Sequence, residues 1–365
     1  MIRILQVIGS LNNGGSQAMI MNLYRNIDRT KIQFDFIIDR EDEIFFADEI
    51  KSMGGRIYIL PIFKGINFFE FTTSWREFFE NHTEYKIIHG HVRSTASIYL
   101  SIAKKFGLKT IAHSHNISSG KGFSALVKNV LQFPIRFKVD QLFACSLEAG
   151  EWLFGKKAVK SSKFKIIKNA IDSKKYKFDL EKRKIVRDYY QLSDKYIIGH
   201  VGRFHNQKNH EFLIDMFNIV SKVRQDAVLM LVGDGELRDS ITTKINKLNL
   251  EDKVLFTGAR NDVHDLMQAM DIFVFPSLFE GLGMVVIEAQ ASGLRCIVSD
   301  NVPNEASITK LVERIPLKQD IWSQVIIGCS EEDRTIDYSE QVRAKGYDID
   351  SNAKEIEDYY FKLYS

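Results

Sequence analysis

The sequence predicts an α/β protein built from two domains. Short apolar runs rich in β-branched residues alternate with helix-like segments along the first half of the chain, and the same alternation starts again after residue 170. Continuous apolar strands that alternate with helices are typical of a parallel sheet covered on both faces. With 365 residues, 45% of them hydrophobic and 27% charged, the chain is long enough for two buried cores and ordinary in composition.

The first half contains six apolar runs that we predict to be strands, each bounded by polar or glycine-containing turns. They are Ile2–Ile8, Phe34–Ile38, Ile57–Leu60, Ile87–His89, Thr110–His113 and Gln141–Cys145. A predicted helix, Gln17–Asn26, follows a loop that contains Gly14 and Gly15. We assign residues 1–170 to the N-terminal domain.

The second half repeats the pattern with five predicted strands and four predicted helices. The strands are Tyr196–Val201, Val228–Val232, Val254–Thr257, Ile272–Phe275 and Cys296–Val298. The helices are His210–Val223, Glu236–Leu248, Val263–Met270 and a segment from about Gly283 to Ser292. We assign residues 171–350 to the C-terminal domain and place the hinge near Asn169–Lys182, which is polar and has no clear hydrophobic period. Two such domains generally meet across a cleft, where ligands bind at the carboxyl ends of the strands.

The final residues, 351–365, are predicted to form a helix that crosses back to the N-terminal domain. Its amphipathic part, Asn352–Tyr364, places four apolar or aromatic residues on one face. These residues are Ile356, Tyr359, Tyr360 and Leu363.

Several protein classes are excluded by composition. The three cysteines, Cys145, Cys296 and Cys329, are far apart and odd in number, so neither a disulfide scaffold nor a cysteine zinc site is expected. No run of about 18 uncharged apolar residues is present, so we expect no membrane-spanning helix. The apolar start of the chain lacks a cleavage-site pattern and is predicted to be a buried strand. We therefore expect a cytoplasmic protein.

Basic residues are concentrated in one part of the chain. The net charge is only +3, but the stretch from Lys104 to Lys168 has 13 basic and 3 acidic residues. Such asymmetry suggests a polyanionic partner, which could be a membrane surface, a nucleic acid or a phosphorylated substrate. The alternative is an ordinary lysine-rich surface.

The motif with the strongest chemical signal contains two glutamates, Glu280 and Glu288, on either side of a glycine-containing loop. This loop follows a predicted strand and opens a helix, so the amides of Gly283, Met284 and Val285 point to one spot at the positive end of the helix dipole. Such a helix start binds anions. In the alternative interpretation, Glu280 is a helix cap and Glu288 is a surface residue.

A second motif, with two cations, follows the first strand of the C-terminal domain. Gly202 and Arg203 end this strand, and Lys208 comes five residues after the arginine. Arginine binds phosphate oxygens bidentately and lysine adds a point charge, so a diphosphate could be neutralised without a metal. The alternative is a pair of ordinary surface cations. The loops containing Gly233 and Arg260 end the next two strands at the same sheet edge, and each is a weak signal alone.

Histidines end two strands of the N-terminal domain. His113 and His115 follow one strand, and His89 and His91 follow another. A histidine at this position can donate a hydrogen bond to a sugar hydroxyl or stabilise charge. Zinc is an alternative, but no third ligand with clear spacing is evident. The loop with Gly15 allows close approach of a phosphate without having the spacing of a dinucleotide motif.

Taken together, these motifs resemble the retaining glycosyltransferases of family 4. The likeness covers nearly the whole chain, from the loop at Gly15, through Asn169–Asp172, which is similar to the family's Asn-Gly-Ile-Asp, to Glu280 and Glu288. It implies the GT-B architecture, two Rossmann-like domains facing across a cleft. A narrower likeness to enzymes of bacterial capsule and exopolysaccharide assembly rests on three segments. They are Ile111–Asn116, Ala144–Gly155 and Val302–Glu305.

The resemblance implies roles for individual residues. Arg203 and Lys208 would bind the donor diphosphate, Glu288 the ribose and Glu280 the donor sugar, while the segment around Arg260 would hold the base. His115 is the better candidate, and His113 the second, for facing the transferred sugar. The remaining donor-binding residues would be Gly15, Gly202, Gly233, Gly281, Leu282, Gly283, Met284 and Val285. Ala170 replaces a usual glycine and Leu282 a common phenylalanine.

The expected function is metal-independent transfer, with retention, of a hexosyl group from a UDP-sugar to a lipid-linked saccharide in polysaccharide biosynthesis. The catalytic residues would be His115, Glu280, Arg203 and Lys208. We expect no cofactor and no nucleic acid, and we expect peripheral attachment to the anionic inner face of the cell membrane. Two alternatives stay open: a nucleotide-sugar 2-epimerase on the same architecture, and a non-enzymatic module that binds polyanions or membranes.

Overall fold

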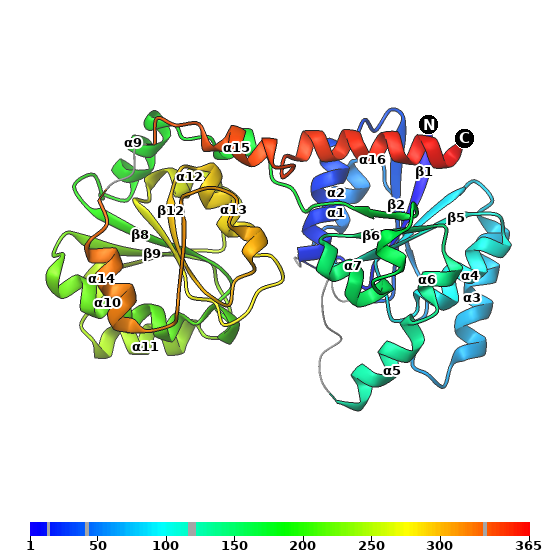
Figure 1. Cartoon of the computed structure of the whole chain (residues 1–365), viewed down its shortest axis with the longest axis horizontal. Helices are drawn as coiled ribbons and strands as arrows, with labels where there is room; N and C mark the ends of the chain where they lie inside the picture. The colour runs from blue at the N-terminus through cyan, green and yellow to red at the C-terminus, as the bar shows by residue number, and fades with distance from the viewer. Residues whose placement is uncertain (13–14, 41–43, 116–121, 331–333) are drawn as a thin grey trace. The chain divides into compact units, whose positions relative to one another are not determined.

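The computed structural model describes residues 1–12, 15–40, 44–115, 122–330 and 334–365. The chain forms two compact units, unit 1 with residues 1–170 and 349–365, and unit 2 with residues 171–348 (Figure 1). The predicted boundaries were 170 and 350, so the second boundary lies two residues earlier in the structure. The prediction of two parallel-sheet α/β domains is confirmed.

Unit 1 contains a seven-stranded sheet in the order β3-β2-β1-β4-β5-β6-β7. All the strand pairs are parallel. The strands are β1 (Ile2–Val7), β2 (Ile32–Ile38), β3 (Ile57–Ile59), β4 (Ile87–Gly90), β5 (Lys109–Ser114), β6 (Gln141–Ala144) and β7 (Phe164–Ile166). The prediction missed β7, because this three-residue edge strand has a lysine at its centre and no continuous apolar run.

Helices cover both faces of this sheet. The helices are α1 (Gly15–Asn26), α2 (Ala47–Ser52), α3 (Phe68–Asn81), α4 (Ala96–Lys105), α5 (Phe123–Gln132), α6 (Ile135–Lys138), α7 (Leu147–Phe154) and α16 (Ile349–Tyr364), with a 3-10 turn η1 (Ala158–Lys160). One core lies under α1, α2 and α16, and the other lies under α3, α4, α6 and α7.

The C-terminal helix α16 belongs to unit 1, lies beside α1, and starts before the predicted Asn352 (Figure 1). Its predicted apolar face is confirmed, because Ile356 and Tyr360 are fully buried in the core with α1, and Tyr359 and Leu363 pack against that core. The amphipathic pattern of the sequence therefore predicts which face of α16 is buried.

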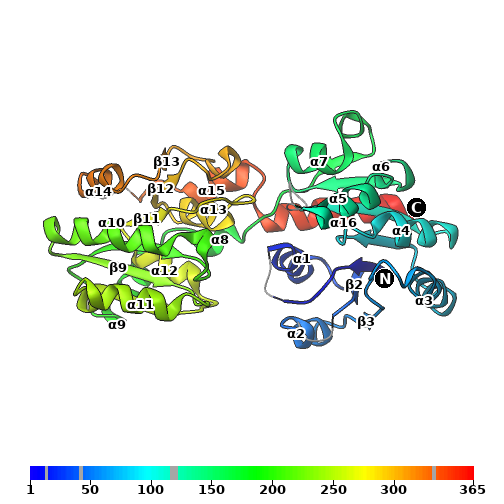
Figure 2. The same ribbon diagram turned by 90° about the horizontal axis from the view of Figure 1, so that it is seen from below.

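Unit 2 contains a six-stranded sheet in the order β10-β9-β8-β11-β12-β13, and its strand pairs are parallel. In Figure 2, β13, β12, β11 and β9 follow one another across this unit. The strands are β8 (Tyr196–Val201), β9 (Ala227–Val232), β10 (Val254–Gly258), β11 (Ile272–Phe275), β12 (Arg295–Ser299) and β13 (Val312–Ile315). The prediction missed the edge strand β13, because Glu313 and Arg314 interrupt its apolar pattern.

The faces of the second sheet are covered by α10, α11 and α14 on one side and by α9, α12 and α13 on the other (Figure 1). The helices are α8 (Ser173–Tyr176), α9 (Leu180–Tyr189), α10 (His210–Val223), α11 (Arg238–Lys247), α12 (Val263–Ala269), α13 (Met284–Ala291), α14 (Gln319–Ile327) and α15 (Tyr338–Ala344). The 3-10 turns are η2 (Asn206–Lys208), η3 (Glu251–Lys253) and η4 (Asn304–Ala306).

The predicted hinge segment, Asn169–Lys182, is more structured than its polar sequence suggested. Asp172 caps α8 by accepting from the Lys175 amide, and Asp179 caps α9 by accepting from the amides of residues 181 and 182. Aspartate at a helix N-cap satisfies amides that have no partner within the helix. The chain passes between the two units at residues 170–171 and 348–349. At these positions Ile171 pairs with Asp348 in a short parallel bridge. Within the described residues, no helix is long and apolar enough to cross a membrane.

Candidate active site

The candidate donor site lies at the carboxyl edge of the sheet of unit 2. The strand order runs outward in opposite directions from β8 and β11, so this pair marks a topological switch point. Ligands of open α/β sheets bind at the carboxyl ends of the strands at such a point. The segment with Arg203 and Lys208 follows β8, and the loop with Glu280 follows β11. The two strongest sequence motifs therefore lie on adjacent strands.

Lys208 and Glu280 form an ion pair at this edge. The Lys208 Nζ is 2.7 Å from Glu280 Oε1, and the exposed fractions of the two side chains are 17% and 8%. The lysine Nζ also lies 4.5 Å from the centre of the Phe275 ring. Glu280 is not a helix cap, because the N-cap position of α13 is Gly283 and no side chain caps it. The alternative interpretations of Glu280 as a cap and of Lys208 as an ordinary surface cation are wrong.

Backbone and side-chain hydrogen bonds fix the relative position of these two loops. The Leu278 amide donates to the Gln207 carbonyl at 2.8 Å, and the Gln207 side chain donates to the Phe279 carbonyl at 2.8 Å. The Asn209 side chain donates to the Pro276 carbonyl at 3.2 Å. Asn209 itself has a positive φ of 58°, which allows η2 to end and α10 to begin at one residue. The ion pair is therefore held on connected backbone.

Arg203 does not join this ion pair. Its side chain is 74% exposed, and its Nη2 lies 3.8 Å from Glu236 Oε2. At that exposure, the contact with Glu236 contributes little to stability. The guanidinium therefore lies in the same segment as Lys208 but beside Glu236 of the loop after β9, with most of its surface open to solvent.

Two glycines allow the loops after β8 and β9 to pack backbone against backbone. Gly233 has a φ of +138°, and a Cβ on it would lie 2.1 Å from the Gly202 carbonyl oxygen. A Cβ on Gly202 would lie 3.2 Å from Lys208 Cδ and from His200 Nε2. Position 233 therefore needs glycine for close approach, whereas a side chain at position 202 would require its neighbouring side chains to shift slightly. At these glycines, the backbones of the two loops and the Lys208 side chain lie close together at the edge of the sheet.

The start of α13 provides the amides that the sequence predicted. Gly283 adopts a left-handed conformation with φ +81°, and the first helical backbone bond runs from the Val286 amide to the Gly283 carbonyl. The amides of Met284 and Val285 therefore lie in the first turn, at the positive end of the dipole. Gly281 has open space where a Cβ would be, and Leu282 packs against the small core around Ile287.

Glu288 lies on α13 and is paired with a residue that the sequence analysis did not single out. The Tyr176 hydroxyl of α8 donates to the Glu288 carboxylate. Burial raises the pKa of Glu288 to about 7, although the Tyr176 hydrogen bond acts in the opposite direction. Tyr176 was missed because it lies in the segment interpreted as a hinge. The sequence signal that could have found Tyr176 is an aromatic residue one helical turn after Asp172, the N-cap of α8.

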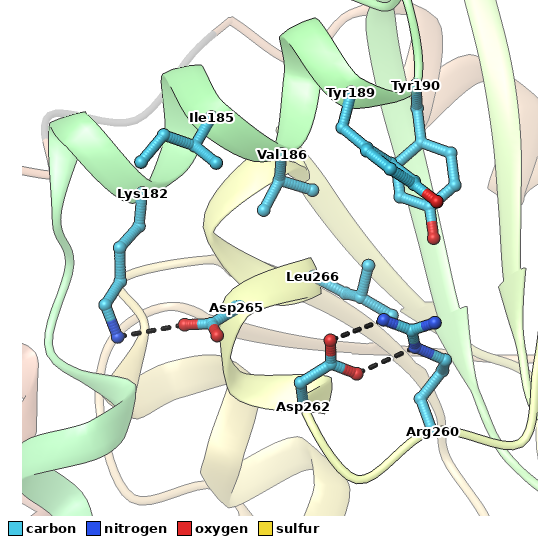
Figure 3. A pocket seen from close by; sticks show the side chains of 9 residues that line it. All are labelled: Lys182, Ile185, Val186, Tyr189, Tyr190, Arg260, Asp262, Asp265 and Leu266. Carbon is cyan, nitrogen blue, oxygen red and sulfur yellow. Dashed lines mark hydrogen bonds and ion pairs between the residues drawn. The ribbon is translucent and has the colours of Figure 1, made fainter.

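Arg260 lies apart from the Lys208–Glu280 pair, and no contact joins them. Its guanidinium makes two hydrogen bonds to the Asp262 carboxylate, the first from Nε at 2.8 Å. Figure 3 shows this pair at one end of a pocket of about 310 Å³ beneath α9, with a second pair, Lys182 and Asp265, at the other end. The Arg260 side chain is thus paired with Asp262.

In unit 1, four histidines gather at the carboxyl ends of β4 and β5. The His113 and His115 rings stack with centroids 4.1 Å apart, and the His89 and His91 rings stack at 4.4 Å. Burial lowers the pKa of all four below the ordinary value of 6.5, to about 4 for His115. Among the described residues, His89, His91 and His113 are a group whose nitrogens, within 4.8 Å of one another, could hold a metal ion.

These histidines also lie at a switch point, because the strand order of unit 1 diverges between β1 and β4. Gly15, the first residue of α1, follows β1 and is exposed. The neighbouring Gly14 and the predicted Asn116 lie outside the described residues. The stacking of His113 on His115 shows that both project from the same face, as strand alternation predicts.

Two parallel-sheet α/β units with polar loops at their switch points define the GT-B class of glycosyltransferases. The family model "Glycosyltransferase Family 4" matches residues 13–175, and the model "Glycosyl transferases group 1" matches residues 181–314. EpsF of Bacillus subtilis (strain 168), named as a glycosyltransferase, is 33% identical over 362 residues, which cover 96% of this chain and 94% of EpsF. The chain therefore belongs to glycosyltransferase family 4.

A further relative and a solved structure of similar fold were also found. The UDP-Gal:alpha-D-GlcNAc-diphosphoundecaprenol alpha-1,3-galactosyltransferase of Escherichia coli is 28% identical over 225 residues, 60% of this chain and 58% of that enzyme. The crystal structure of Anabaena HepE in complex with UDP and glucose has a TM-score of 0.77 at 20% identity and covers 99% of both chains. This protein is a glycosyltransferase, and it transfers a sugar from a nucleotide sugar to an acceptor.

Proposed function

We propose that the protein transfers a hexosyl group from a UDP-sugar, with retention and without a metal ion, to a lipid-linked saccharide. The observation that carries this proposal is the partly buried Lys208–Glu280 pair beside the start of α13. A lysine and helix-start amides at one switch point suit the two negative phosphates of a nucleotide diphosphate. The UDP and UDP-sugar specificity is supported by the Escherichia coli relative and by the ligands in the HepE structure.

In this proposal the leaving UDP is the group that needs stabilisation. The bond from the anomeric carbon to the β-phosphate oxygen breaks, and that oxygen takes the electron pair. Lys208, Arg203 and the amides of α13 stabilise this charge, and such preorganised electrostatics is usually the largest contribution to catalysis. The acceptor hydroxyl attacks the same face of the sugar and passes its proton to the departing phosphate, so the configuration is retained. Glu280 stays paired with Lys208 and orients the sugar hydroxyls.

Glu288 and the histidines would complete donor recognition. The Glu288 carboxylate would accept hydrogen bonds from the ribose hydroxyls, and Tyr176 would hold it in place. In unit 1, His115 and His113 would contact hydroxyls of the transferred sugar, as their place after β5 suggests. These roles rest on position and chemistry, and each can be tested by substitution.

A screen of UDP-sugars in the presence of EDTA tests the donor, the metal independence and the reaction class together. We expect UDP release with one UDP-hexose, no loss with EDTA, and an α-linked product from an α-configured donor by ¹H NMR. Activity that requires a divalent cation, or a β-linked product, would contradict the proposal. Interconversion of UDP-GlcNAc at C2 without an acceptor would instead identify a 2-epimerase.

The acceptor is proposed to be a saccharide on a polyprenyl diphosphate, in exopolysaccharide or capsule assembly. The activity for which the Escherichia coli relative is named, on a diphosphoundecaprenol-linked sugar, supports this choice. The test compares a synthetic lipid-diphosphate saccharide with the same saccharide lacking the lipid and diphosphate. Equal kcat/KM values for the two would contradict a lipid-linked acceptor.

We also propose that unit 1 binds the anionic inner face of the cell membrane. A pocket of about 470 Å³ between α6 and α7 is lined by Arg136, Lys156, Lys157 and Lys163 around an apolar floor. Exposed apolar side chains lie on the same unit, on α5, α6, the start of α3 and the loop before α3. They are Ile66, Phe68, Phe69, Leu126, Val130 and Phe137. Basic clusters beside exposed apolar residues are typical of attachment to anionic lipid.

Flotation with vesicles tests this attachment. We expect binding to vesicles containing anionic phospholipid at low salt, weaker binding at high salt, and weaker binding of a variant with Lys156, Lys157 and Lys163 changed to Glu. A matched control changes three exposed lysines of unit 2, Lys184, Lys222 and Lys247, in the same way. No flotation of the wild-type protein at low salt, or equal loss in both variants, would contradict the proposal.

A further inference from the structure

The four histidines at the carboxyl ends of β4 and β5 are connected to one buried amide, Gln6 of β1, through two chains of hydrogen bonds. In the first relay, Gln6 Nε2 donates to the Tyr360 hydroxyl at 3.2 Å, this hydroxyl is 2.7 Å from His89 Nδ1, and His89 Nε2 is 3.2 Å from His113 Nδ1. In the second relay, Gln6 Oε1 is 2.9 Å from His91 Nε2, and His91 Nδ1 is 2.7 Å from His115 Nε2. All the links lie within unit 1.

Each histidine of these relays is neutral at physiological pH, because burial lowers its pKa. A neutral imidazole has one N–H donor and one lone-pair acceptor, so a bond at one ring nitrogen fixes the role of the other. A Tyr hydroxyl has a single proton to donate. Consequently, the direction of the first bond in each relay determines every bond that follows.

The direction of the first relay follows from Gln6. Because the Tyr360 hydroxyl accepts from Gln6 Nε2, its own proton is available for His89 Nδ1. His89 then carries its proton on Nε2 and donates it to His113 Nδ1. His113 is left with its proton on Nε2. This Nε2 is buried and has no hydrogen-bond partner among the described residues.

The second relay runs in the opposite direction. Gln6 Oε1 can only accept, so His91 donates from Nε2 and has a lone pair on Nδ1. His115 donates from Nε2 to that lone pair and is left with an unprotonated Nδ1. All four histidines are therefore Nε2–H tautomers. If the Gln6 amide were rotated by 180°, all four would become Nδ1–H tautomers, and the two ends would exchange roles.

We propose that Gln6 and Tyr360 are positioning residues that fix the tautomer of His113, so that its Nε2–H donates to one hydroxyl of the sugar substrate. The hydroxyl oxygen of a sugar accepts hydrogen bonds, so a fixed N–H donor matches it. The inference rests on the proposed function for the role of His113. The relay itself does not, because it follows from the contacts within unit 1.

The buried donor on His113 supports this inference. A buried polar atom without a partner costs roughly 1–3 kcal/mol, and native proteins keep such an atom where a ligand or water satisfies it. His113 lies at the carboxyl end of β5, at the edge where a ligand of this fold binds. Its ring is stacked against His115, which fixes the plane of the His113 ring.

The relay is tested first by the tautomers in the free protein, which do not depend on activity. Long-range ¹H–¹⁵N correlation of the histidine rings distinguishes Nε2–H from Nδ1–H. We expect His89, His91, His113 and His115 to show one common tautomer, Nε2–H for the Gln6 orientation described. A mixture of tautomers among the four would overturn the relay. A stoichiometric metal ion held by these rings, detected by elemental analysis of the purified protein, would also overturn it.

The functional part is tested by Tyr360→Phe, with Tyr359→Phe as a matched control on the same helix. Tyr359 also loses one hydroxyl hydrogen bond, to Gln141 Oε1 at 2.6 Å, but it is outside both relays. Loss of a group that orients a histidine typically lowers activity about 10- to 100-fold. We expect this loss in kcat for Tyr360→Phe, with mixed His89 and His113 tautomers, and a change of less than about twofold for Tyr359→Phe.

Equal kcat values for the two variants would overturn the role of the relay in catalysis, even if the tautomers are uniform. This failure is distinguishable from failure of the proposed function. If the donor site is elsewhere, substitution of Lys208 leaves UDP release unchanged while the tautomers stay uniform. A further variant, Gln6→Leu, removes both ends of the amide and is expected to mix the tautomers of all four histidines.

Discussion

Lys208→Ala removes the cation from the candidate diphosphate site and should lower both activity and stability. Glu280 is only 8% exposed, so without Lys208 its carboxylate would be left with little solvent and no cation. Breaking a buried ion pair by removing one partner costs about 3 kcal/mol or more. For catalysis, loss of one preorganised charge-stabilising group typically lowers kcat about 10²- to 10³-fold. We expect a loss of kcat/KM of this size.

The assay measures UDP release from the preferred donor and the free energy of unfolding by denaturant. The double variant Lys208→Ala/Glu280→Ala should recover about 1–3 kcal/mol of the stability lost in the single variant, because no unpaired carboxylate stays behind. Its activity should not recover. Lys244→Ala is the matched control, since Lys244 forms an ion pair of the same length, 2.7 Å, with Asp215 between two helices of unit 2.

The reasoning would be refuted if Lys208→Ala kept activity within about threefold of the wild-type protein. An equal loss of activity in Lys244→Ala would also refute it, because the effect would then reflect stability of unit 2 alone. If Lys208→Ala loses activity at a temperature far below its unfolding midpoint, the loss reflects catalysis and not unfolding of unit 2.

Three further predictions follow from burial and backbone geometry. Gly233→Ala should destabilise unit 2 by at least about 2 kcal/mol, measured by thermal unfolding, because φ is +138° and its Cβ would meet the Gly202 carbonyl at 2.1 Å; an unchanged midpoint would contradict this. The pKa of Glu288 is about 7, so the donor KM should rise as the pH falls below 7 and the carboxylate becomes protonated. If the donor KM of Glu288→Gln depends on pH as steeply as that of the wild-type protein, Glu288 is excluded as the cause. The pKa of His115 is lowered to about 4, so this histidine binds a proton at a higher pH in the unfolded protein than in the native protein. His115 should therefore lower the free energy of unfolding by about 3 kcal/mol as the pH falls from 6.5 to 4. A free energy of unfolding that does not change over this pH range would contradict the burial of His115.

The strands were predictable because parallel sheets buried on both faces produce long apolar runs. β8 and β11 have the predicted bounds. The edge strand β13 was missed because an edge strand is covered by fewer neighbours and tolerates charges such as Glu313 and Arg314. Helix α9 was missed because charged residues interrupt its apolar pattern: Arg183 and Arg187 on its buried side bind Asp271, and Val186 packs against the core beside them.

The candidate site was predictable where residues follow strands directly. Lys208 and Glu280 were assigned to one edge, since carboxyl ends of parallel strands share an edge, and the structure adds the ion pair between them. Because of this pair, Lys208→Ala is expected to lower stability as well as activity. Tyr176 could not be linked to Glu288 from the sequence, because they are far apart in the chain and only packing of α8 on α13 brings them together.

The connection of His89 to Tyr360 was also outside the reach of the sequence. The spacing of the histidines showed that pairs would share a face of the sheet, and the amphipathic pattern showed that Tyr360 would be buried. Neither pattern gives the partner of a buried hydroxyl, which depends on where α16 lies on the sheet of unit 1.

The division of the chain has a consequence for the order in which the protein matures during translation. Unit 2 is continuous, whereas unit 1 needs residues 349–365 to complete its core, including Ile356 and Tyr360. A growing chain released from the ribosome in sequence order therefore has all the residues of the second unit before the first is complete. Until α16 emerges, the apolar groups it covers stay exposed, so a nascent or truncated chain is open to proteases and chaperones and lacks the Tyr360 link to His89.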